Sequence, residues 1–182
     1  KTVAVPGLRT TAATLLRAAL AEDRPGLPVP GAAYLPVRYD EIVAAVTAGR
    51  AEAGLLIHET ALAAAGHGLS VLLDLGCWWQ GQMPDVPVPL GVILARKSLG
   101  PERLAALDAL LRGSLGIARE HPGLIAPLVR LFAREIDQAV IDAHINAYVG
   151  DLSLDMGALG RAALERLAEM AAGRHFPAAP PL

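Results

Sequence analysis

The sequence predicts an α/β lobe followed by a helical segment, and three observations support this prediction. Strand-like and helix-like stretches alternate through residues 1–96 with short connections. The strand-like stretches are nearly continuous apolar runs, as expected when helices cover both faces of a sheet. From Pro101 onward only helical patterns occur. A βαβα order with short loops is typical of parallel strands, so we expect an α/β lobe at residues 1–96 and helices within residues 97–182.

The expected lobe contains short elements with recognisable ends. Pro6 and Gly7 end the first strand, Thr10 and Thr11 precede the first helix, and Asp40 is the expected N-cap of the second. Strands are expected at Thr2–Val5, Tyr34–Tyr39, Glu52–Ile57, Val71–Leu75 and Leu90–Arg96. Helices are expected at Ala12–Leu20, Glu41–Ala48 and Thr60–Ala65, with a loop at Pro25–Gly31.

The helical segment begins at Pro101, a residue suited to the first turn of a helix. Helices are expected at Pro101–Glu120, Leu124–Glu135, Asp137–Val149 and Met156–Ala172, followed by a frayed tail at Phe176–Leu182. Asp137 and Asp155 are the expected N-caps of the last two helices. Their apolar residues exceed what a small sheet can cover: Leu107, Leu110, Leu111, Leu115, Ile125, Leu128, Leu131 and Phe132. An apolar helix stripe needs a partner, and either a second sheet or mutual packing as a bundle would provide one.

Composition limits the classes of function. Hydrophobic residues make up 53% of the 182 residues, and the net charge of −2 indicates no nucleic-acid partner. No apolar run reaches the roughly 18–20 residues of a membrane span. The single cysteine, Cys77, excludes an internal disulfide, fits a reducing compartment and is expected to be a packed thiol. Lys1 lies in a strand-like run without an initiator Met, so we expect a preceding segment.

Common nucleotide, nucleophile and metal motifs do not occur in the sequence. A Walker loop, a Rossmann glycine fingerprint and a nucleophile elbow are all absent. His58-Glu59 begins like a zinc-protease helix, but Leu62 stands where the second His belongs. The five histidines show no metal-ligand spacing, so no metal ion is expected.

Two positions remain as candidate sites. At Pro6–Ala12 a tight turn leads into a helix, whose first N–H groups can bind carboxylate or phosphate oxygens. A simple N-cap role for Thr10 or Thr11 explains the same pattern. His58 follows an aliphatic strand at the end where ligands bind in open α/β sheets. Its imidazole could accept a proton near neutral pH, although a hydrogen-bonded structural histidine is the alternative.

Trp78 and Trp79 follow the expected strand at Val71–Leu75. Most such pairs pack in a core or at a hinge. An apolar wall beside an aromatic ligand is the functional alternative.

Several segments, in order and spacing, resemble the second lobe of the 1,4-dihydroxy-6-naphthoate synthase family. They are Val3–Gly7, Thr10–Ala12, Arg38–Ile42, Gly54–Glu59, Asp74–Trp79, Pro87–Arg96, His144–Val149 and Ser153–Gly157. The resemblance covers nearly the whole chain. The Ile57-His58-Glu59 segment separates the synthase from its sister in the same pathway, chorismate dehydratase. Residues that differ from those common in the family are Thr60, Cys77, Gln80, Phe132 and Arg134.

The resemblance implies the two-lobed fold of type II periplasmic binding proteins, with residues 97–182 returning to the first lobe. It implies cleavage of cyclic dehypoxanthine futalosine to 1,4-dihydroxy-6-naphthoate in cytoplasmic menaquinone biosynthesis, without a metal ion or organic cofactor. His58 would be the general base. Thr10, Thr11 and the N–H of Ala12 would hold oxygens of this small-molecule substrate. Because adjacent side chains of a strand point to opposite faces, Glu59 next to His58 is expected to have a structural role.

Two other functions stay open: a non-catalytic solute-binding protein of the same fold, and chorismate dehydratase. A base at His58 favours an enzyme, since a binding cleft does not need one. The first lobe of the family supplies further substrate contacts. We therefore expect the 182-residue chain alone to be poorly active and to self-associate through its apolar helix surface.

Overall fold

The computed structural model describes residues 1–21, 31–62, 64–133 and 137–173. Contacts divide the chain into two units, Lys1–Leu90 together with the chain from Gly157 onward, and Gly91–Met156. Most of the expected loop at Pro25–Gly31 and the expected tail at Phe176–Leu182 lie outside the described residues. The lobe boundaries expected from the sequence, 1–96 and 97–182, stay a prediction.

The first unit is built on a three-stranded parallel sheet, which confirms the α/β prediction. The strands β1 (Thr2–Val5), β2 (Ala33–Pro36) and β3 (Ala53–Gly54) lie in the order β2-β1-β3. Val3 of β1 is in register with Tyr34 of β2 and Ala53 of β3. The central strand is therefore the one nearest the start of the chain.

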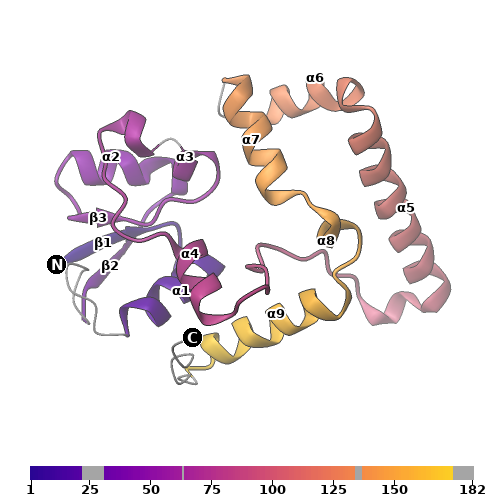
Figure 1. Ribbon diagram of the computed structural model, residues 1–182, viewed down its shortest axis with the longest axis horizontal. Coiled ribbons are helices and arrows are strands. Elements are labelled where there is room, and N and C mark those ends of the chain that lie inside the picture. The colour runs from indigo at the N-terminus through magenta and orange to yellow at the C-terminus, as the bar shows by residue number, and fades with distance from the viewer. Residues whose placement is uncertain (22–30, 63, 134–136, 174–182) are drawn as a thin grey trace. The chain divides into compact units, whose positions relative to one another are not determined.

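Helices cover both faces of this sheet (Figure 1). Val3 and Val5 of β1 pack in one cluster with residues of α1 (Thr11–Leu20). The intervening Ala4 packs on the other face against Ile42 and Ala45 of α2 (Ile42–Thr47). Because successive side chains of a strand point to opposite faces, an apolar run at Thr2–Val5 serves both helices.

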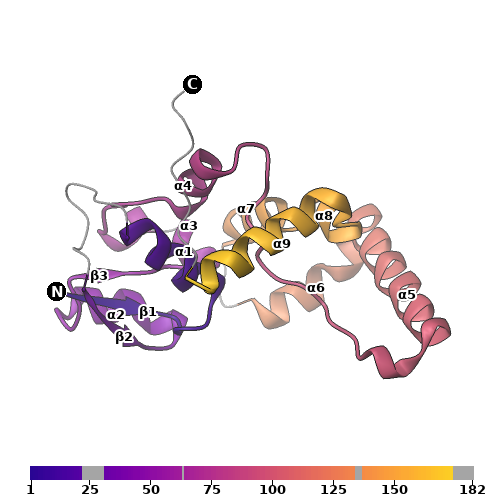
Figure 2. The same cartoon turned by 90° about the horizontal axis from the view of Figure 1, so that it is seen from below.

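Two further helices complete a second cluster beside α1. Helices α4 (Leu75–Gln82) and α9 (Gly157–Ala171) lie next to α1 in both views (Figures 1 and 2). Trp79 is fully buried, and its Nε1–H donates to the carbonyl of Val86 at 2.7 Å. Trp78 and Trp79 pack with Ala163 of α9, so the core interpretation of the tryptophan pair is confirmed. The prediction that Cys77 is packed is wrong, since this residue of α4 is exposed.

The close approach of α2 to β3 gives a test of the packing. A Cβ atom added at Gly54 would lie 2.6 Å from Cγ2 of Ile42 and 3.0 Å from Cγ2 of Val46. Because Ile42 is fully buried and cannot easily move, Gly54→Ala should lower the free energy of unfolding by about 1–3 kcal/mol. Urea denaturation followed by circular dichroism measures this. Gly81→Ala in α4, where the added Cβ meets open space, should instead raise stability by about 0.5–1 kcal/mol. Equal stabilities for Gly54→Ala and the wild type would contradict the tight approach.

Several predicted strands are shorter than expected or are not strands. The strand expected at Glu52–Ile57 is limited to β3 because its neighbour β1 ends at Val5, and the N–H of Leu55 makes the last bond to that strand, with Ala4 O at 2.8 Å. The strand expected at Tyr34–Tyr39 ends at Pro36. Its last residues enter the 3-10 turn η1 (Tyr39–Glu41).

The runs at Val71–Leu75 and Leu90–Arg96 are not strands, so those two predictions are wrong. The described sheet offers them no partner, and Asp74 instead caps α4 by accepting from the N–H of Cys77 at 2.9 Å. In the second run Ile93 is 77% exposed and Leu94 is 86% exposed. The residues of this run are as apolar as those of a buried strand, but no described strand pairs with them and their side chains are exposed.

The second unit contains the helices α5 (Pro101–Glu120), α6 (Pro122–Phe132), α7 (Gln138–Tyr148) and α8 (Asp151–Leu154), after the 3-10 turn η3 (Lys97–Leu99). Pro101 occupies the first turn of α5, as predicted. Pro122 does the same for α6, which therefore begins before the predicted Leu124. Asp137 caps α7 by accepting from the N–H of Ala139 at 2.8 Å, as predicted. The short helix α8 was not predicted.

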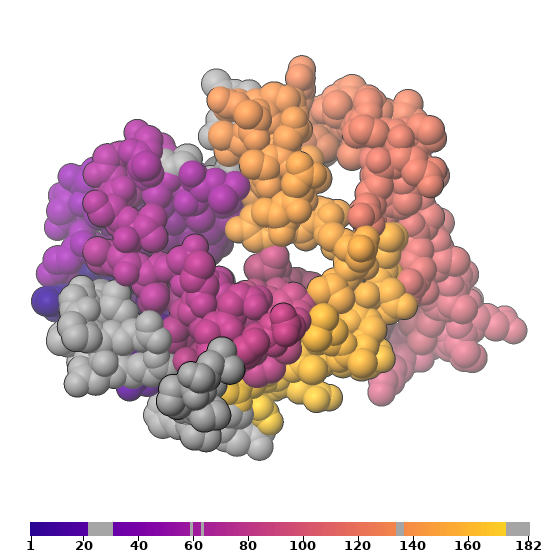
Figure 3. Space-filling model, viewed as in Figure 1, coloured from indigo at the N-terminus to yellow at the C-terminus, as the bar shows by residue number. Residues whose placement is uncertain are grey.

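Helices α5 and α6 bury none of their described residues, and Figure 3 shows them at the surface. Their exposed large apolar residues are Leu107, Leu110, Leu111, Ile117, Leu124, Leu128, Leu131 and Phe132. The two helices contact each other but form no closed core, so a self-contained bundle does not account for them. In the part of the chain that the structure describes, no helix has both the length and the apolarity to cross a bilayer.

Candidate functional site

The carboxyl ends of the three parallel strands bring three loops to one edge of the sheet. The N–H of Val37 after β2 bonds to Val5 O at 3.0 Å, and the N–H of Leu55 after β3 bonds to Ala4 O at 2.8 Å. The chain then continues to α1 from β1, to η1 from β2, and to His58 from β3. Ligands of open α/β sheets bind at this edge. The two segments predicted to form the site, the start of α1 and His58, both lie at this edge.

The start of α1 is an ordered N-cap. The Thr10 hydroxyl accepts from the N–H of Ala13 at 3.1 Å and donates to the carbonyl of Gly7 at 3.2 Å. Thr10 is therefore the N-cap of α1, which was one of the two roles that the sequence allowed for it. The first N–H groups of a helix have no partner within the helix. Since Thr10 serves Ala13, the N–H groups of Thr11 and Ala12 are the ones directed out of the helix start.

Arg17 holds the loop that leads into α1. Its Nη1–H donates to the carbonyl of Leu8 at 2.9 Å, and its Nη2–H donates to the Thr14 hydroxyl at 3.3 Å. Gly7 at the beginning of this loop has φ of 139°, a conformation that glycine adopts without strain. The helix start thus has a fixed backbone before any ligand binds.

His58 occupies a turn between β3 and the short helix α3 (Glu59–Leu62), which a 3-10 turn η2 (Ala64–His67) follows. Its φ of 59° is left-handed, which is uncommon for a residue with a side chain. Its carbonyl accepts from the N–H of Ala61 at 3.2 Å, and the residue is exposed. The expectation that His58 ends a strand is therefore wrong in detail. His58 and Glu59 lie in a turn and in α3, not in a strand. The alternation of strand side chains, from which a structural role was expected for Glu59, therefore does not apply at these two positions.

A contact that the sequence did not predict joins two of the loops. The rings of Tyr39 and His58 meet edge to face, with centroids 5.0 Å apart and an interplanar angle of 71°. Tyr39 is half-buried and packs on the cluster that contains Ile42 and Ala45. The two residues are far apart in sequence, and only the crossover from β2 to β3 brings them together.

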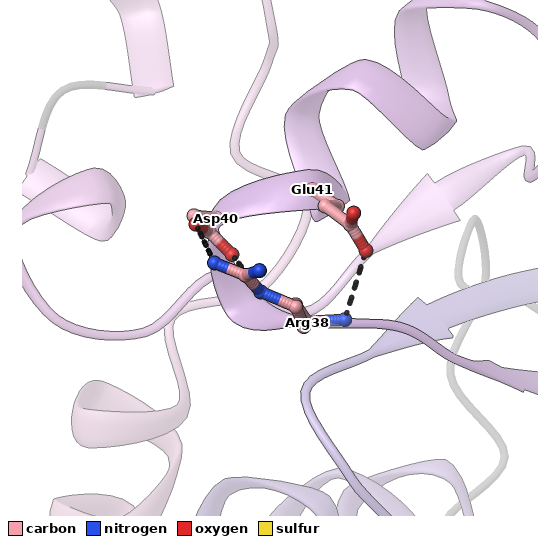
Figure 4. Close-up of polar contacts among 3 residues, drawn as sticks. All are labelled: Arg38, Asp40 and Glu41. Atoms are coloured by element: carbon pink, nitrogen blue, oxygen red, sulfur yellow. Dashed lines mark hydrogen bonds and ion pairs between the residues drawn. The ribbon is translucent and has the colours of Figure 1, made fainter.

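The turn that carries Tyr39 is held by its charged neighbours (Figure 4). The Arg38 guanidinium donates to both carboxylate oxygens of Asp40, at 3.2 and 2.8 Å, and the Arg38 N–H donates to the Glu41 carboxylate at 3.4 Å. The hydrogen bond to Asp40 and the charge of Asp40 raise the pKa of Arg38. Asp40 therefore does not cap α2 as predicted, because the neighbouring guanidinium binds its carboxylate.

Within the described ranges, His, Cys, Asp and Glu side chains form no group of three that could hold a metal ion. The chemistry available at this edge of the sheet is therefore that of an imidazole, two directed backbone N–H groups and the Thr11 hydroxyl. Such a set can transfer a proton and bind an anionic or polar oxygen.

A protein-family sequence model described as "Menaquinone biosynthesis" matches residues 1–173. The chain is similar to the 1,4-dihydroxy-6-naphthoate synthase of Thermus thermophilus, with 40% identity over 98% of this chain and 62% of that protein. It is also similar to the synthase of Streptomyces coelicolor, with 39% identity over 94% of this chain and 60% of that protein.

A crystal structure of a protein from Archaeoglobus fulgidus matches with a TM-score of 0.85 and 33% identity, over 96% of this chain and 62% of that one. The chain therefore spans about 60% of the length of the curated relatives that it matches.

Proposed function

Since the chain belongs to the menaquinone biosynthesis family, we propose that it is the larger part of a 1,4-dihydroxy-6-naphthoate synthase. The proposed reaction is the cleavage of cyclic dehypoxanthine futalosine to 1,4-dihydroxy-6-naphthoate, in the cytoplasm and without a metal ion or organic cofactor. The observation that carries this proposal is 40% identity to the Thermus thermophilus synthase over 98% of this chain. The placement of His58 at the ligand-binding edge of the sheet supports it.

In this proposal His58 is the general base that removes a proton from the substrate and so begins cleavage. The N–H groups of Thr11 and Ala12, with the Thr11 hydroxyl, bind substrate oxygens. The partial positive charge at the start of α1 favours an oxygen that gains negative charge as the proton leaves. Thr10 contributes indirectly, because its cap fixes the first turn of that helix.

The proposed fold is the two-lobed one of type II periplasmic binding proteins, and the first unit supplies one wall of the substrate cleft. The exposed apolar side chains of Leu90–Leu94 and of α5 and α6 would contact the other lobe. This assignment gives a partner to surface that otherwise faces water. It is also consistent with the share of the relatives' length that the chain covers.

The test uses a fusion of this chain with the segment of the Thermus thermophilus synthase that the chain does not match. We call this fusion the completed protein. Incubation with cyclic dehypoxanthine futalosine should release 1,4-dihydroxy-6-naphthoate, detected by liquid chromatography and mass spectrometry. Binding of the substrate without turnover would instead indicate a solute-binding protein. Turnover of chorismate, and not of the futalosine derivative, would indicate the dehydratase.

A further inference from the structure

His58 combines an uncommon backbone conformation with an aromatic neighbour from another loop. A left-handed backbone at a residue with a Cβ atom persists only where the surroundings fix it, and His58 has φ of 59°. The residue is exposed and lies in a turn, so core packing does not hold its ring. The ring of Tyr39, from another loop, meets the His58 ring edge to face at 5.0 Å between centroids.

Tyr39 is itself rigidly placed. Before it, the N–H of Val37 bonds to Val5 O at 3.0 Å, which ties the turn to the central strand. After it, the N–H of Glu41 bonds to Arg38 O at 2.9 Å and closes the turn η1. The Tyr39 side chain packs beside fully buried residues of α2. A ring anchored to the core thus contacts the imidazole of an exposed residue.

We propose that Tyr39 is a positioning residue for His58, which fixes the orientation of the imidazole toward substrate held at the start of α1. The inference rests on the proposed role of His58 as the base. Aromatic rings prefer the edge-to-face arrangement seen here, so the contact selects one ring orientation among the rotamers open to an exposed histidine. A base that is misplaced by a fraction of the reacting distance loses much of its effect, and substrate binding at α1 does not depend on that orientation.

The kinetic test compares three variants of the completed protein. Tyr39→Leu removes the ring and keeps apolar packing, and should lower kcat about 10-fold with KM changed less than about 2-fold. Tyr39→Phe keeps the ring and should stay within about 2-fold of the wild type. Tyr34→Leu is the matched control, because Tyr34 is a half-buried tyrosine of β2 that packs in the cluster with α1. It should leave kcat near the wild-type value even if it lowers Tm.

A second measurement does not depend on turnover. In the completed protein with ¹³C-labelled histidine, the His58 ring carbons should show a ring-current shift and restricted motion. Both should persist in Tyr39→Phe and disappear in Tyr39→Leu, with Tyr39→Met as the replacement if that variant does not fold. Averaged, mobile His58 signals in the wild type would overturn the inference without any variant.

The two proposals fail in different ways. If the completed protein does not cleave cyclic dehypoxanthine futalosine, the proposed function fails, and the catalytic meaning of the Tyr39 contact fails with it. If the completed protein is active and Tyr39→Leu keeps its kcat, only the positioning role of Tyr39 is wrong. A loss in Tyr39→Leu that Tyr34→Leu reproduces would also overturn that role, since it would reflect stability alone.

Discussion

Replacing His58 with Asn should lower the kcat of the completed protein by about 100-fold or more, the usual contribution of a general base. Substrate affinity, measured by calorimetry, should stay within a few-fold, because the proposed oxygen-binding groups are those at the start of α1. Asn is the appropriate replacement because it tolerates a left-handed backbone better than most residues, and His58 has φ of 59°. An alanine at this position would combine loss of the base with backbone strain.

The division of the loss between kcat and substrate affinity separates loss of a base from other damage. In His58→Asn the loss should fall on kcat. His67→Asn is the matched control, since His67 is an exposed histidine of the same unit in the neighbouring turn η2, and it should keep the wild-type kcat. Near-normal turnover in His58→Asn, or a loss explained wholly by weaker binding, would disprove the assignment.

The 182-residue chain alone should show less than about 1% of the turnover of the completed protein. In the proposed two-lobed fold this chain supplies only one complete wall of the cleft, so it would neither position the substrate nor exclude water from it, and each of these effects contributes several kcal/mol to lowering a barrier. Without the proposed other lobe, the apolar side chains of Leu90–Leu94, α5 and α6 should also stay uncovered. We therefore expect the chain alone to self-associate at micromolar concentration, and light scattering coupled to size-exclusion chromatography measures this.

Single charges placed on the exposed apolar surface test the cause of that association. Leu94→Glu and Leu131→Glu replace side chains that are 86% and 74% exposed, and each should shift the chain toward monomer. Ala109→Glu adds the same charge at an exposed small residue of α5 and should have little effect. A wild-type chain that is monomeric and fully active would contradict both the incomplete cleft and the role of this surface.

Local sequence signals predicted the elements whose formation is local. Thr10, Asp137 and Pro101 each sit where capping and first-turn preferences place them. The apolar run at Thr2–Val5 became the central strand because its neighbours also lie in this chain. The prediction that both site segments lie at the same edge of the sheet required only that the strands be parallel.

The failures share a different cause, which is dependence on non-local partners. The length of β3 is set by where β1 ends, not by the apolar residues at Glu52–Ile57. The run at Leu90–Arg96 reads as a strand but finds no strand to pair with in the described sheet. Tyr39 lies in a segment that resembles the family, Arg38–Ile42, but its contact with His58 depends on a crossover that spacing in the sequence does not reveal.

The position of α9 has a consequence for how the first unit forms during synthesis. Ala163 of this helix is 1% exposed and packs with Trp78 and Trp79, yet the whole of the second unit is translated between them. The ribosome therefore releases the sheet, α1 and α4 well before the helix that closes their tryptophan cluster. Until α9 emerges, those two indoles pack against α1 but lack the helix that covers their remaining side, so part of this apolar cluster stays open during the synthesis of residues 91–156.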